Sequence, residues 1–160
     1  MDLVKEFSEL FRGLERAHGS YDIKDQESNG KMSGIAQTLN EPVNDELWKD
    51  HLKGKKGLGI IPINDEAECY WGAADIDKYD LDIPKEIKKI SEKGYPLVPC
   101  RTKSGGLHLF LFCKTAIPAR LMQEKLTEMA ASCGFGGCEI FPKQIKLLVE
   151  RGDVGSWLNM

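Results

Sequence analysis

Two carboxylates stand two residues apart at the end of an apolar segment. Asp75 and Asp77 close the run CYWGAADID, which begins at Cys69. Side chains alternate along a β-strand, so residues i and i+2 point to the same face. Two adjacent carboxylates repel each other unless a cation neutralises them, and hard divalent ions such as Mg²⁺ or Mn²⁺ prefer oxygen ligands. The pair therefore indicates a divalent metal site; the alternative is a solvated strand end that leads into a turn.

A basic, glycine-rich turn joins two later apolar segments, PLVPCR and LHLFLF. Residues 101–108 read RTKSGGLH. Glycines let backbone N–H groups approach an anion closely, and cationic and hydroxyl side chains add donors, so the turn suits a phosphate. It is not a Walker A loop, because that motif needs G-x-x-x-x-G-K-[ST] before a helix. The alternative is an ordinary polar hairpin followed by a histidine, His108, that faces the core.

A single acid occupies a third apolar segment, CEIFPKQ, which begins at Cys138. If Glu139 joins Asp75 and Asp77, three carboxylates can hold two divalent ions, with substrate phosphates and water completing the coordination. The alternative is a strand-edge acid with its head in water.

The elements that must position these residues are helices and short strands. Spacing, caps and flanking glycines predict helices over residues 3–14, 45–52, 84–93 and 118–132. Apolar runs predict one β-hairpin from 58–63 and 69–77, a second from 96–101 and 107–112, and short strands near 138–141, 145–149 and 156–160. Residues 19–34 have few apolar side chains and many turn formers, which predicts a mobile surface loop. Together these elements predict an α+β fold with a mixed or antiparallel sheet and helices on one face.

Composition limits the classes of protein that remain. The 160 residues are 41% hydrophobic, which is typical of one globular domain. A formal net charge of −3 excludes a histone-like or tail-driven nucleic-acid binder. The sequence has neither an apolar run long enough to span a bilayer nor a signal peptide, so we expect a cytoplasmic protein without a membrane partner. Five cysteines without a C-x-x-C pair predict reduced, mostly buried thiols.

Three motifs in order resemble those of a known superfamily. DID at 75–77, S-x-x-x-H from Ser104 to His108 and EIFPKQ at 139–144 are similar to the catalytic motifs of the archaeo-eukaryotic primases. The flanking segments FSELFRGLERAHGSY, ELWKDHLKGKKGLGIIPI, CRTKSGGLHLFLF and GSWLNM resemble the primase-polymerase domains of TOTE conflict systems and related phage or CRISPR-associated proteins. The resemblance covers nearly the whole chain. It implies an RRM-like sheet that carries all three motifs and packs against an N-terminal α/β unit.

The resemblance also implies roles for individual residues. Asp75, Asp77 and Glu139 would be the metal ligands, and Ser104 and His108 would contact a nucleoside triphosphate. Further candidate contacts to nucleotide or template are Arg101, Lys103, Gly105, Gly106, Lys143 and Gln144.

The third motif and the end of the chain depart from the family pattern. Many members carry aspartate where this chain has Glu139, which reaches one methylene further. Related domains continue after the W-x-N-x segment, so we expect one catalytic domain over residues 1–160 that is a C-terminally truncated fragment. Helicase or nuclease modules would then belong to the larger protein or operon, of prokaryotic, phage or mobile-element origin.

We therefore expect a DNA primase or polymerase that joins nucleoside triphosphates on a nucleic-acid template and primer. Of two Mg²⁺ or Mn²⁺ ions, one would activate the attacking 3′-hydroxyl and the other would stabilise charge on the leaving group. Template contact must come from local basic surface, for which Lys53, Lys55 and Lys56 are the candidates.

Two other functions remain open. A metal-dependent nuclease would explain the acids but not the phosphate-like turn. A catalytically silent RRM-like binding module would need exposed aromatic side chains on its sheet, which Phe110 and Phe112 would supply beside His108.

Overall fold

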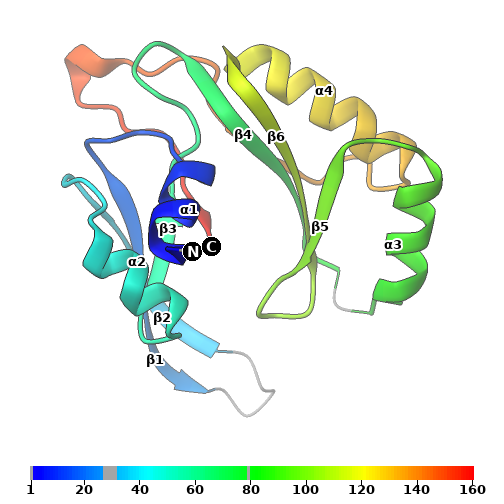
Figure 1. The fold of residues 1–160 in the computed structure, drawn as a ribbon, viewed down its shortest axis with the longest axis horizontal. Coiled ribbons are helices and arrows are strands. Elements are labelled where there is room, and N and C mark those ends of the chain that lie inside the picture. The colour runs from blue at the N-terminus through cyan, green and yellow to red at the C-terminus, as the bar shows by residue number, and fades with distance from the viewer. Residues whose placement is uncertain (1, 27–31, 79) are drawn as a thin grey trace.

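The computed structural model describes residues 2–26, 32–78 and 80–160. Its helices and two antiparallel sheets confirm the predicted α+β fold (Figure 1). The elements in chain order are α1 (Leu3–Leu10), β1 (His18–Gln26), β2 (Met32–Leu39), α2 (Asp45–Leu52), β3 (Gly57–Ile60), β4 (Glu68–Ile76), α3 (Ile83–Glu92), β5 (Leu97–Arg101), β6 (Leu107–Pro118), α4 (Ala119–Ser132), β7 (Glu139–Phe141), the 3₁₀-helix η1 (Val149–Arg151) and β8 (Leu158–Asn159). None of the helices within these ranges has the length and apolar character needed to cross a bilayer.

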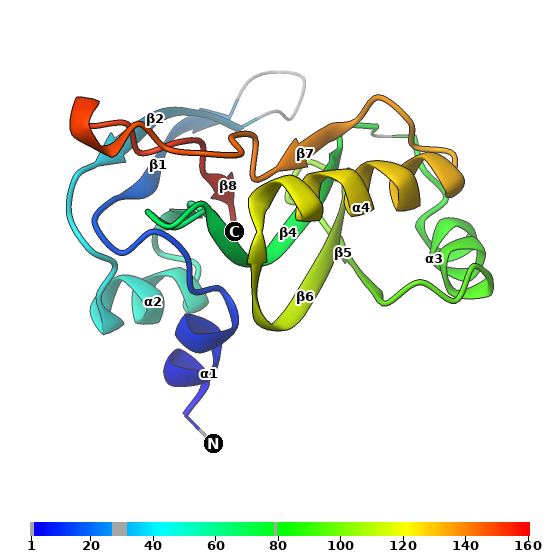
Figure 2. The same cartoon turned by 90° about the horizontal axis from the view of Figure 1, so that it is seen from above.

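The sheet that carries the three motifs has the strand order β5-β6-β4-β7, and every neighbouring pair is antiparallel. With α3 after β4 and α4 after β6, the chain follows the β-α-β-β-α-β path of ferredoxin-like and RRM-like folds. Helices α3 and α4 cover one face of this sheet (Figures 1 and 2). Buried Ile76, Leu107 and Leu109 pack there against Met122 and Leu126. The expected RRM-like sheet is therefore present.

The second sheet belongs to an N-terminal unit and has the order β2-β1-β3-β8. Helices α1 and α2 lie beside it, and β8 returns from the end of the chain to pair with β3 (Figure 1). Trp157, next to β8, packs flat on β1 and β3: a Cβ at Gly19 or Gly59 would lie 2.2 or 2.3 Å from its ring. The C-terminal segment thus completes the expected N-terminal α/β unit.

An aromatic core joins the two units. Phe11, which follows α1, places its ring 5.3 Å from that of Trp71, 5.4 Å from Phe110 and 5.5 Å from Phe112. Trp48 of α2 stacks on Phe11 from the other side. Phe110 is only 4% exposed, because the N-terminal unit covers this part of the sheet. The exposed aromatic platform that an RRM-like binding module would need is therefore absent at Phe110.

The first predicted hairpin was wrong, because the partners of its two strands lie far apart in sequence. Segments 58–63 and 69–77 do not form a hairpin: β3 and β4 belong to different sheets. The turn between them exists, since the Asn64 side chain accepts hydrogen bonds from the backbone N–H groups of Glu66 and Glu68. A turn reverses the chain, but it does not decide which sheet each flanking strand joins.

Residues 19–34, predicted to be a surface loop, form most of a hairpin of β1 and β2, paired from His18 and Leu39 to Gln26 and Met32. The tip of this predicted loop lies outside the described residues. Trp157, from near the end of the chain, covers Gly19 of β1, which a local pattern cannot indicate.

Smaller differences concern where α1 ends and one short strand that is not formed. Helix α1 stops at Leu10, because the next residues leave the helix to bond the core: Leu14 N–H donates to the Ile61 carbonyl and the Trp71 indole to the Arg12 carbonyl. The strand predicted at 145–149 is not formed, and the segment bends into η1 with Leu148 exposed. The other three predicted helices are confirmed, with Asn44 and Asp82 as N-caps of α2 and α3.

The prediction of mostly buried cysteines holds for Cys69 and Cys133, whereas Cys113 and Cys138 are half-buried and Cys100 is exposed. Burial raises the pKa of the Cys69 thiol to about 12, so this thiol stays protonated at neutral pH.

Candidate active site

The strand register brings the three motifs to one level of the sheet. Asp75 in β4 lies directly opposite His108 in β6 and, on its other side, opposite Glu139 in β7. Opposite residues of antiparallel strands project from the same face. Trp71 and Ala73 share this face with Asp75, since they precede it by even steps along β4. Asp75, His108 and Glu139 therefore lie on the face turned toward the N-terminal unit.

His108 holds the Asp75 carboxylate at the base of this site. Its Nε2 lies 3.2 Å from Asp75 Oδ1, and both side chains are largely buried. The His108 ring stands perpendicular to the ring of Phe110, at 5.6 Å between centroids. The imidazole therefore links the aromatic core to the Asp75 carboxylate.

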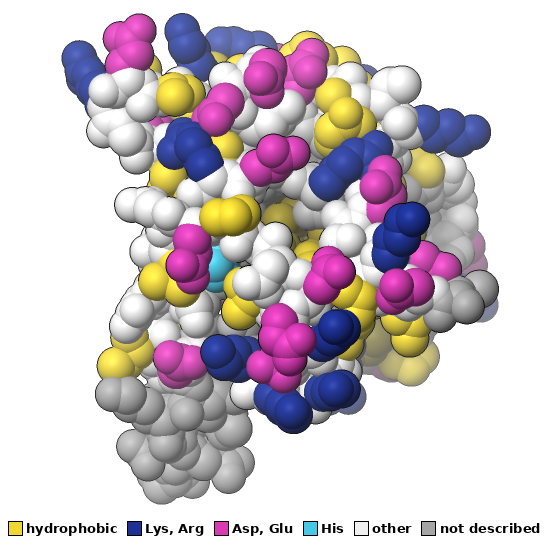
Figure 3. Space-filling model, turned by 60° about the vertical axis from the view of Figure 1, so that its left-hand side comes forward, with side chains coloured by type: hydrophobic (Ala, Val, Ile, Leu, Met, Phe, Trp, Pro, Cys, Tyr) yellow, Lys and Arg dark blue, Asp and Glu magenta, His cyan; other side chains and the backbone are white. Residues whose placement is uncertain are grey.

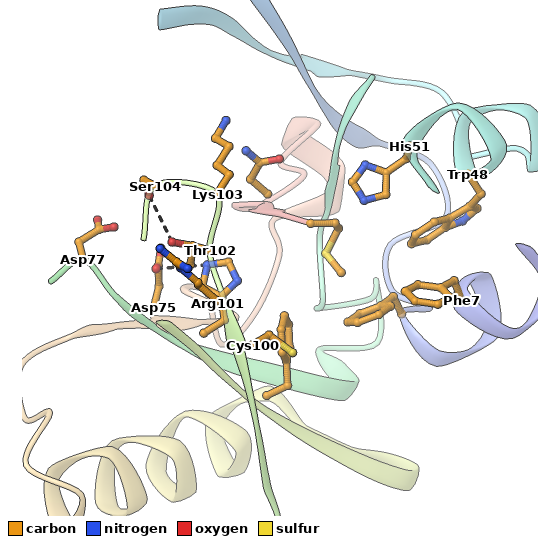
Figure 4. Close-up of a pocket in the computed structure, with 15 residues that line it drawn as sticks. Phe7, Trp48, His51, Asp75, Asp77, Cys100, Arg101, Thr102, Lys103 and Ser104 are labelled. Carbon is orange, nitrogen blue, oxygen red and sulfur yellow. Dashed lines mark hydrogen bonds and ion pairs between the residues drawn. The ribbon is translucent and has the colours of Figure 1, made fainter. Parts of the chain in front are cut away.

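A cavity of about 330 Å³ runs from the two aspartates to helices α1 and α2. Asp75, Asp77, His108 and residues 101–104 line its polar end, and Phe7, Trp48 and His51 line its aromatic end (Figure 4). Phe11, Cys100, Phe110, Asn159 and Met160 complete the lining. Arg101, Lys103 and Ser104 therefore surround the same space as Asp75 and Asp77.

Two glycines seat the basic turn against the end of β4. Gly105 has a φ of +93°, which L side chains rarely adopt, and a Cβ at Gly106 would lie 2.5 Å from the Ile76 carbonyl oxygen. The turn is closed by Gly105 N–H, which donates to the Thr102 carbonyl, and by Thr102 N–H, which donates to that of Gly106. The Gly105 N–H is therefore used within the turn. Thr102 and Ser104 line the cavity, and their hydroxyl oxygens lie 3.2 Å apart.

Gly106→Ala should destabilise the fold, because the new methyl group can be accommodated only if the turn moves away from β4. Overpacking of this kind costs about 1 to 3 kcal/mol. We expect the melting temperature to fall by roughly 2 to 4 °C for each kcal/mol in a chain of this size, measured by circular dichroism. Gly136→Ala is the matched control, since its Cβ would meet only Ala131, at 3.7 Å. Equal falls in both variants would contradict the role assigned to Gly106.

Lys103 is held by an aromatic ring of the N-terminal unit. Its Nζ lies 3.6 Å from the ring centroid of Tyr21 in β1. Burial lowers the pKa of the Lys103 ammonium below its ordinary value. A ring attracts an ammonium without cancelling its charge, so Lys103 keeps its attraction for an anion. Sequence reasoning missed Tyr21, because β1 was predicted to be a loop.

Glu139 lies opposite Asp75 in the backbone register, but its side chain contacts Lys143. Its Oε2 lies 2.8 Å from Lys143 Nζ, and the side chain is 58% exposed. Glu139, Asp75 and Asp77 all line a second hollow of about 250 Å³ on the β7 side of β4. Among the residues described, no three His, Cys, Asp or Glu side chains are gathered closely enough to hold a metal ion. The sheet therefore places Glu139 opposite Asp75, but the side chains of Asp75, Asp77 and Glu139 do not converge on one metal position.

Gln144 forms two hydrogen bonds with Ser156. Its Nε2 donates to the Ser156 hydroxyl at 3.0 Å, and its Oε1 accepts from the Ser156 N–H at 2.9 Å. These bonds tie the strand exit after β7 to the segment that enters β8, whose Asn159 lines the cavity. Gln144 itself lines neither hollow, so its predicted contact with nucleotide or template stays a prediction.

The basic residues predicted to contact a template follow α2. Lys53, Lys55 and Lys56 are all exposed, and Lys55 Nζ lies 3.6 Å from Asp50. The Lys56 carbonyl lies 3.1 Å from Nδ1 of His51, which lines the cavity. On the face shown in Figure 3, basic and acidic side chains are interspersed, as the net charge of −3 implies. The three lysines after α2 therefore lie beside the aromatic end of the cavity, which His51 lines.

The sequence also matches a protein-family model. The family model described as "TOTE conflict system, Archaeo-Eukaryotic Primase domain" matches residues 6–158, so the chain belongs to this family. The resemblance to this family, predicted from the sequence, is thereby confirmed. Membership places the chain among primase-type nucleotidyltransferase domains, which are generally metal-dependent. No curated protein matches the sequence.

Sequence reasoning also missed the aromatic end of the cavity. Trp48 and His51 are three residues apart on a correctly predicted helix, which places them on one face. Phe7 and Phe11 have the matching four-residue spacing. These spacings predict shared faces, but they do not show that the faces meet the second motif, because that contact depends on how the two units pack.

Proposed function

We propose that this domain is the catalytic unit of a template-dependent primase-polymerase that joins nucleoside triphosphates by a two-metal mechanism. The observation that carries the proposal is the polar end of the cavity, where two carboxylates face a basic turn. Phosphoryl-transfer enzymes combine these features, because metal ligands must sit beside groups that bind the phosphate chain. Family membership supports the same class of reaction.

The donor set fits Mg²⁺ or Mn²⁺. Asp75 and Asp77 line both hollows, and the register places Glu139 opposite Asp75. Carboxylate oxygens are the ligands that these hard ions prefer. When bound, the ions would lower the pKa of the attacking 3′-hydroxyl and neutralise charge on the triphosphate. For Glu139 to join the aspartates, its side chain has to exchange Lys143 for the ion.

The remaining residues bind and orient. Arg101, Lys103 and Ser104 would contact the phosphate chain, since they surround the same space as the aspartates. His108 would position Asp75 through their 3.2 Å contact and present its ring to the triphosphate. The lysines after α2 would contact a nucleic-acid template and primer, and helicase or nuclease modules of a larger protein or operon would supply the other steps.

Primer extension tests the proposal directly. The 160-residue chain is incubated with a labelled primer on a template, nucleoside triphosphates and Mg²⁺ or Mn²⁺. We expect extension that follows the template, releases pyrophosphate and stops when a chelator removes the metal. Shortening of the labelled strand without extension would favour a nuclease. Neither reaction, together with no density for Mn²⁺ or nucleoside triphosphate in soaked crystals, would favour a silent module.

A further inference from the structure

We propose that the aromatic end of the cavity binds the base of the incoming nucleotide, so that helices α1 and α2 form part of the substrate site. This inference rests on the proposed function, because it assumes that the polar end holds the triphosphate. Phe7 of α1 and His51 of α2 would provide the stacking surface, with Trp48 behind them. The motifs themselves include none of these residues.

The arrangement of the rings supports a stacking site. Trp48 is 3% exposed, whereas Phe7 and His51 are only half-buried and keep ring surface toward the cavity. The Trp48 ring lies 6.3 Å from that of Phe7 and 6.1 Å from that of His51. The buried Trp48 ring thus packs against the rings of Phe7 and His51, which are more accessible than Trp48 itself. This is the arrangement expected of a rigid aromatic platform. Base stacking on such rings is tolerant of sequence, because every base has a π face.

The polar atoms beside the rings suit a base better than a wholly apolar ligand. His51 Nδ1 lies 3.1 Å from the Lys56 carbonyl, an acceptor, so Nδ1 carries the hydrogen. In the neutral ring Nε2 is then an acceptor. Asn159 lines the same cavity, and its amide side chain has both donors and an acceptor. A nucleobase combines an apolar face with a polar edge, and this lining matches both.

The cavity is continuous between the two ends, which points to one ligand that spans them. A volume of about 330 Å³ is that of a site for a single small molecule. Figure 4 shows Asp75, Asp77 and Ser104 on one side and Phe7, Trp48 and His51 on the other. A nucleoside triphosphate has this polarity, with its charge at one end and its ring system at the other.

Two ligands separate the base from the phosphates. Calorimetric titration with Ca²⁺ present compares a nucleoside triphosphate with inorganic tripolyphosphate, which has the charge but no base. Phe7→Leu keeps an apolar side chain and removes the ring. We expect it to weaken nucleoside triphosphate binding about tenfold, within the range of base stacking on aromatic side chains, and to leave tripolyphosphate binding unchanged. His51→Ala should show the same difference between the two ligands.

Leu10→Ala is the control on the same helix, because Leu10 is 43% exposed and does not line the cavity. It should change neither affinity. Equal loss for both ligands in folded Phe7→Leu and His51→Ala, or no loss for either, would overturn the base site while the proposed function stands. Equal affinity of the unmutated protein for the two ligands would do the same. If the unmutated protein binds neither ligand, the proposed function itself fails, and the base site with it.

Discussion

Asp77→Ala should abolish metal-dependent nucleotide incorporation without lowering the melting temperature. Asp77 follows β4 and is exposed, yet it lines both hollows beside Asp75. A bound metal contributes several kcal/mol to the stabilisation of a transition state, and each ~1.4 kcal/mol changes the rate tenfold. We therefore expect activity to fall by about a thousandfold or more, measured as primer extension in Mg²⁺ and in Mn²⁺.

The stability of Asp77→Ala should not fall with its activity. Substitutions at exposed positions usually change the free energy of unfolding by less than about 0.5 kcal/mol. Removing one of two adjacent carboxylates also relieves their repulsion in the metal-free protein. The melting temperature of Asp77→Ala, measured without metal, should therefore stay the same or rise. In the unmutated protein, added Mn²⁺ should raise it, because a ligand that binds only the folded state stabilises that state.

Asp80→Ala is the matched control, since Asp80 is exposed, lies three residues further along and lines neither hollow. It should retain both activity and the metal-induced rise in melting temperature. A large fall in the melting temperature of Asp77→Ala, with activity lost only in proportion to unfolding, would show that this aspartate is structural.

Local signals predicted the helices well. Asp2 and Asn44 each accept hydrogen bonds from the first turn of the helix that follows, as their residue types indicate, and Pro84 stands in the first turn of α3. The hairpin of β5 and β6 was also predictable, because a glycine-containing turn separates two apolar runs. These features depend on residues close in sequence.

The errors concern partners that are distant in sequence. Segment 19–34, which includes most of β1 and the start of β2, contains few apolar residues, and Trp157 from the far end of the chain covers Gly19 of β1 and Gly59 of the neighbouring β3. Similarly, β3 pairs with β8 rather than with the adjacent β4. A pattern along the sequence identifies a strand by its own composition, so a polar strand whose cover comes from elsewhere looks like a loop.

In the candidate site, too, the features set by residues close in sequence were predictable, and those set by side-chain rotamers or by distant partners were not. The alternation rule indicated that Asp75 and Asp77 share a face, and the basic turn does meet them at one cavity. The contact between Glu139 and Lys143 depends on side-chain rotamers, which spacing does not determine. The aromatic end depends on the packing of Phe11 between the two units, which no motif encodes.

His108 offers the second large expected effect, because it connects the carboxylates with the phosphate-binding turn. Its Nε2 lies 3.2 Å from Asp75, and its ring lines the same cavity as Lys103 and Ser104. If these three residues bind the triphosphate, their contacts are made to the phosphates farthest from the base. A monophosphate has no charge there, so its binding should depend little on His108.

His108→Ala should therefore weaken nucleoside triphosphate binding strongly and monophosphate binding little. A hydrogen bond to a charged group contributes roughly 1.5 to 3 kcal/mol, which corresponds to about ten- to a hundredfold in affinity. Calorimetric titration of both ligands, with Ca²⁺ or Mg²⁺ present, measures the difference. Lys114→Ala, on the same strand but exposed and away from the cavity, should change neither affinity. Equal losses for the two ligands in His108→Ala would instead indicate a general disturbance of the sheet, because the imidazole also packs on Phe110.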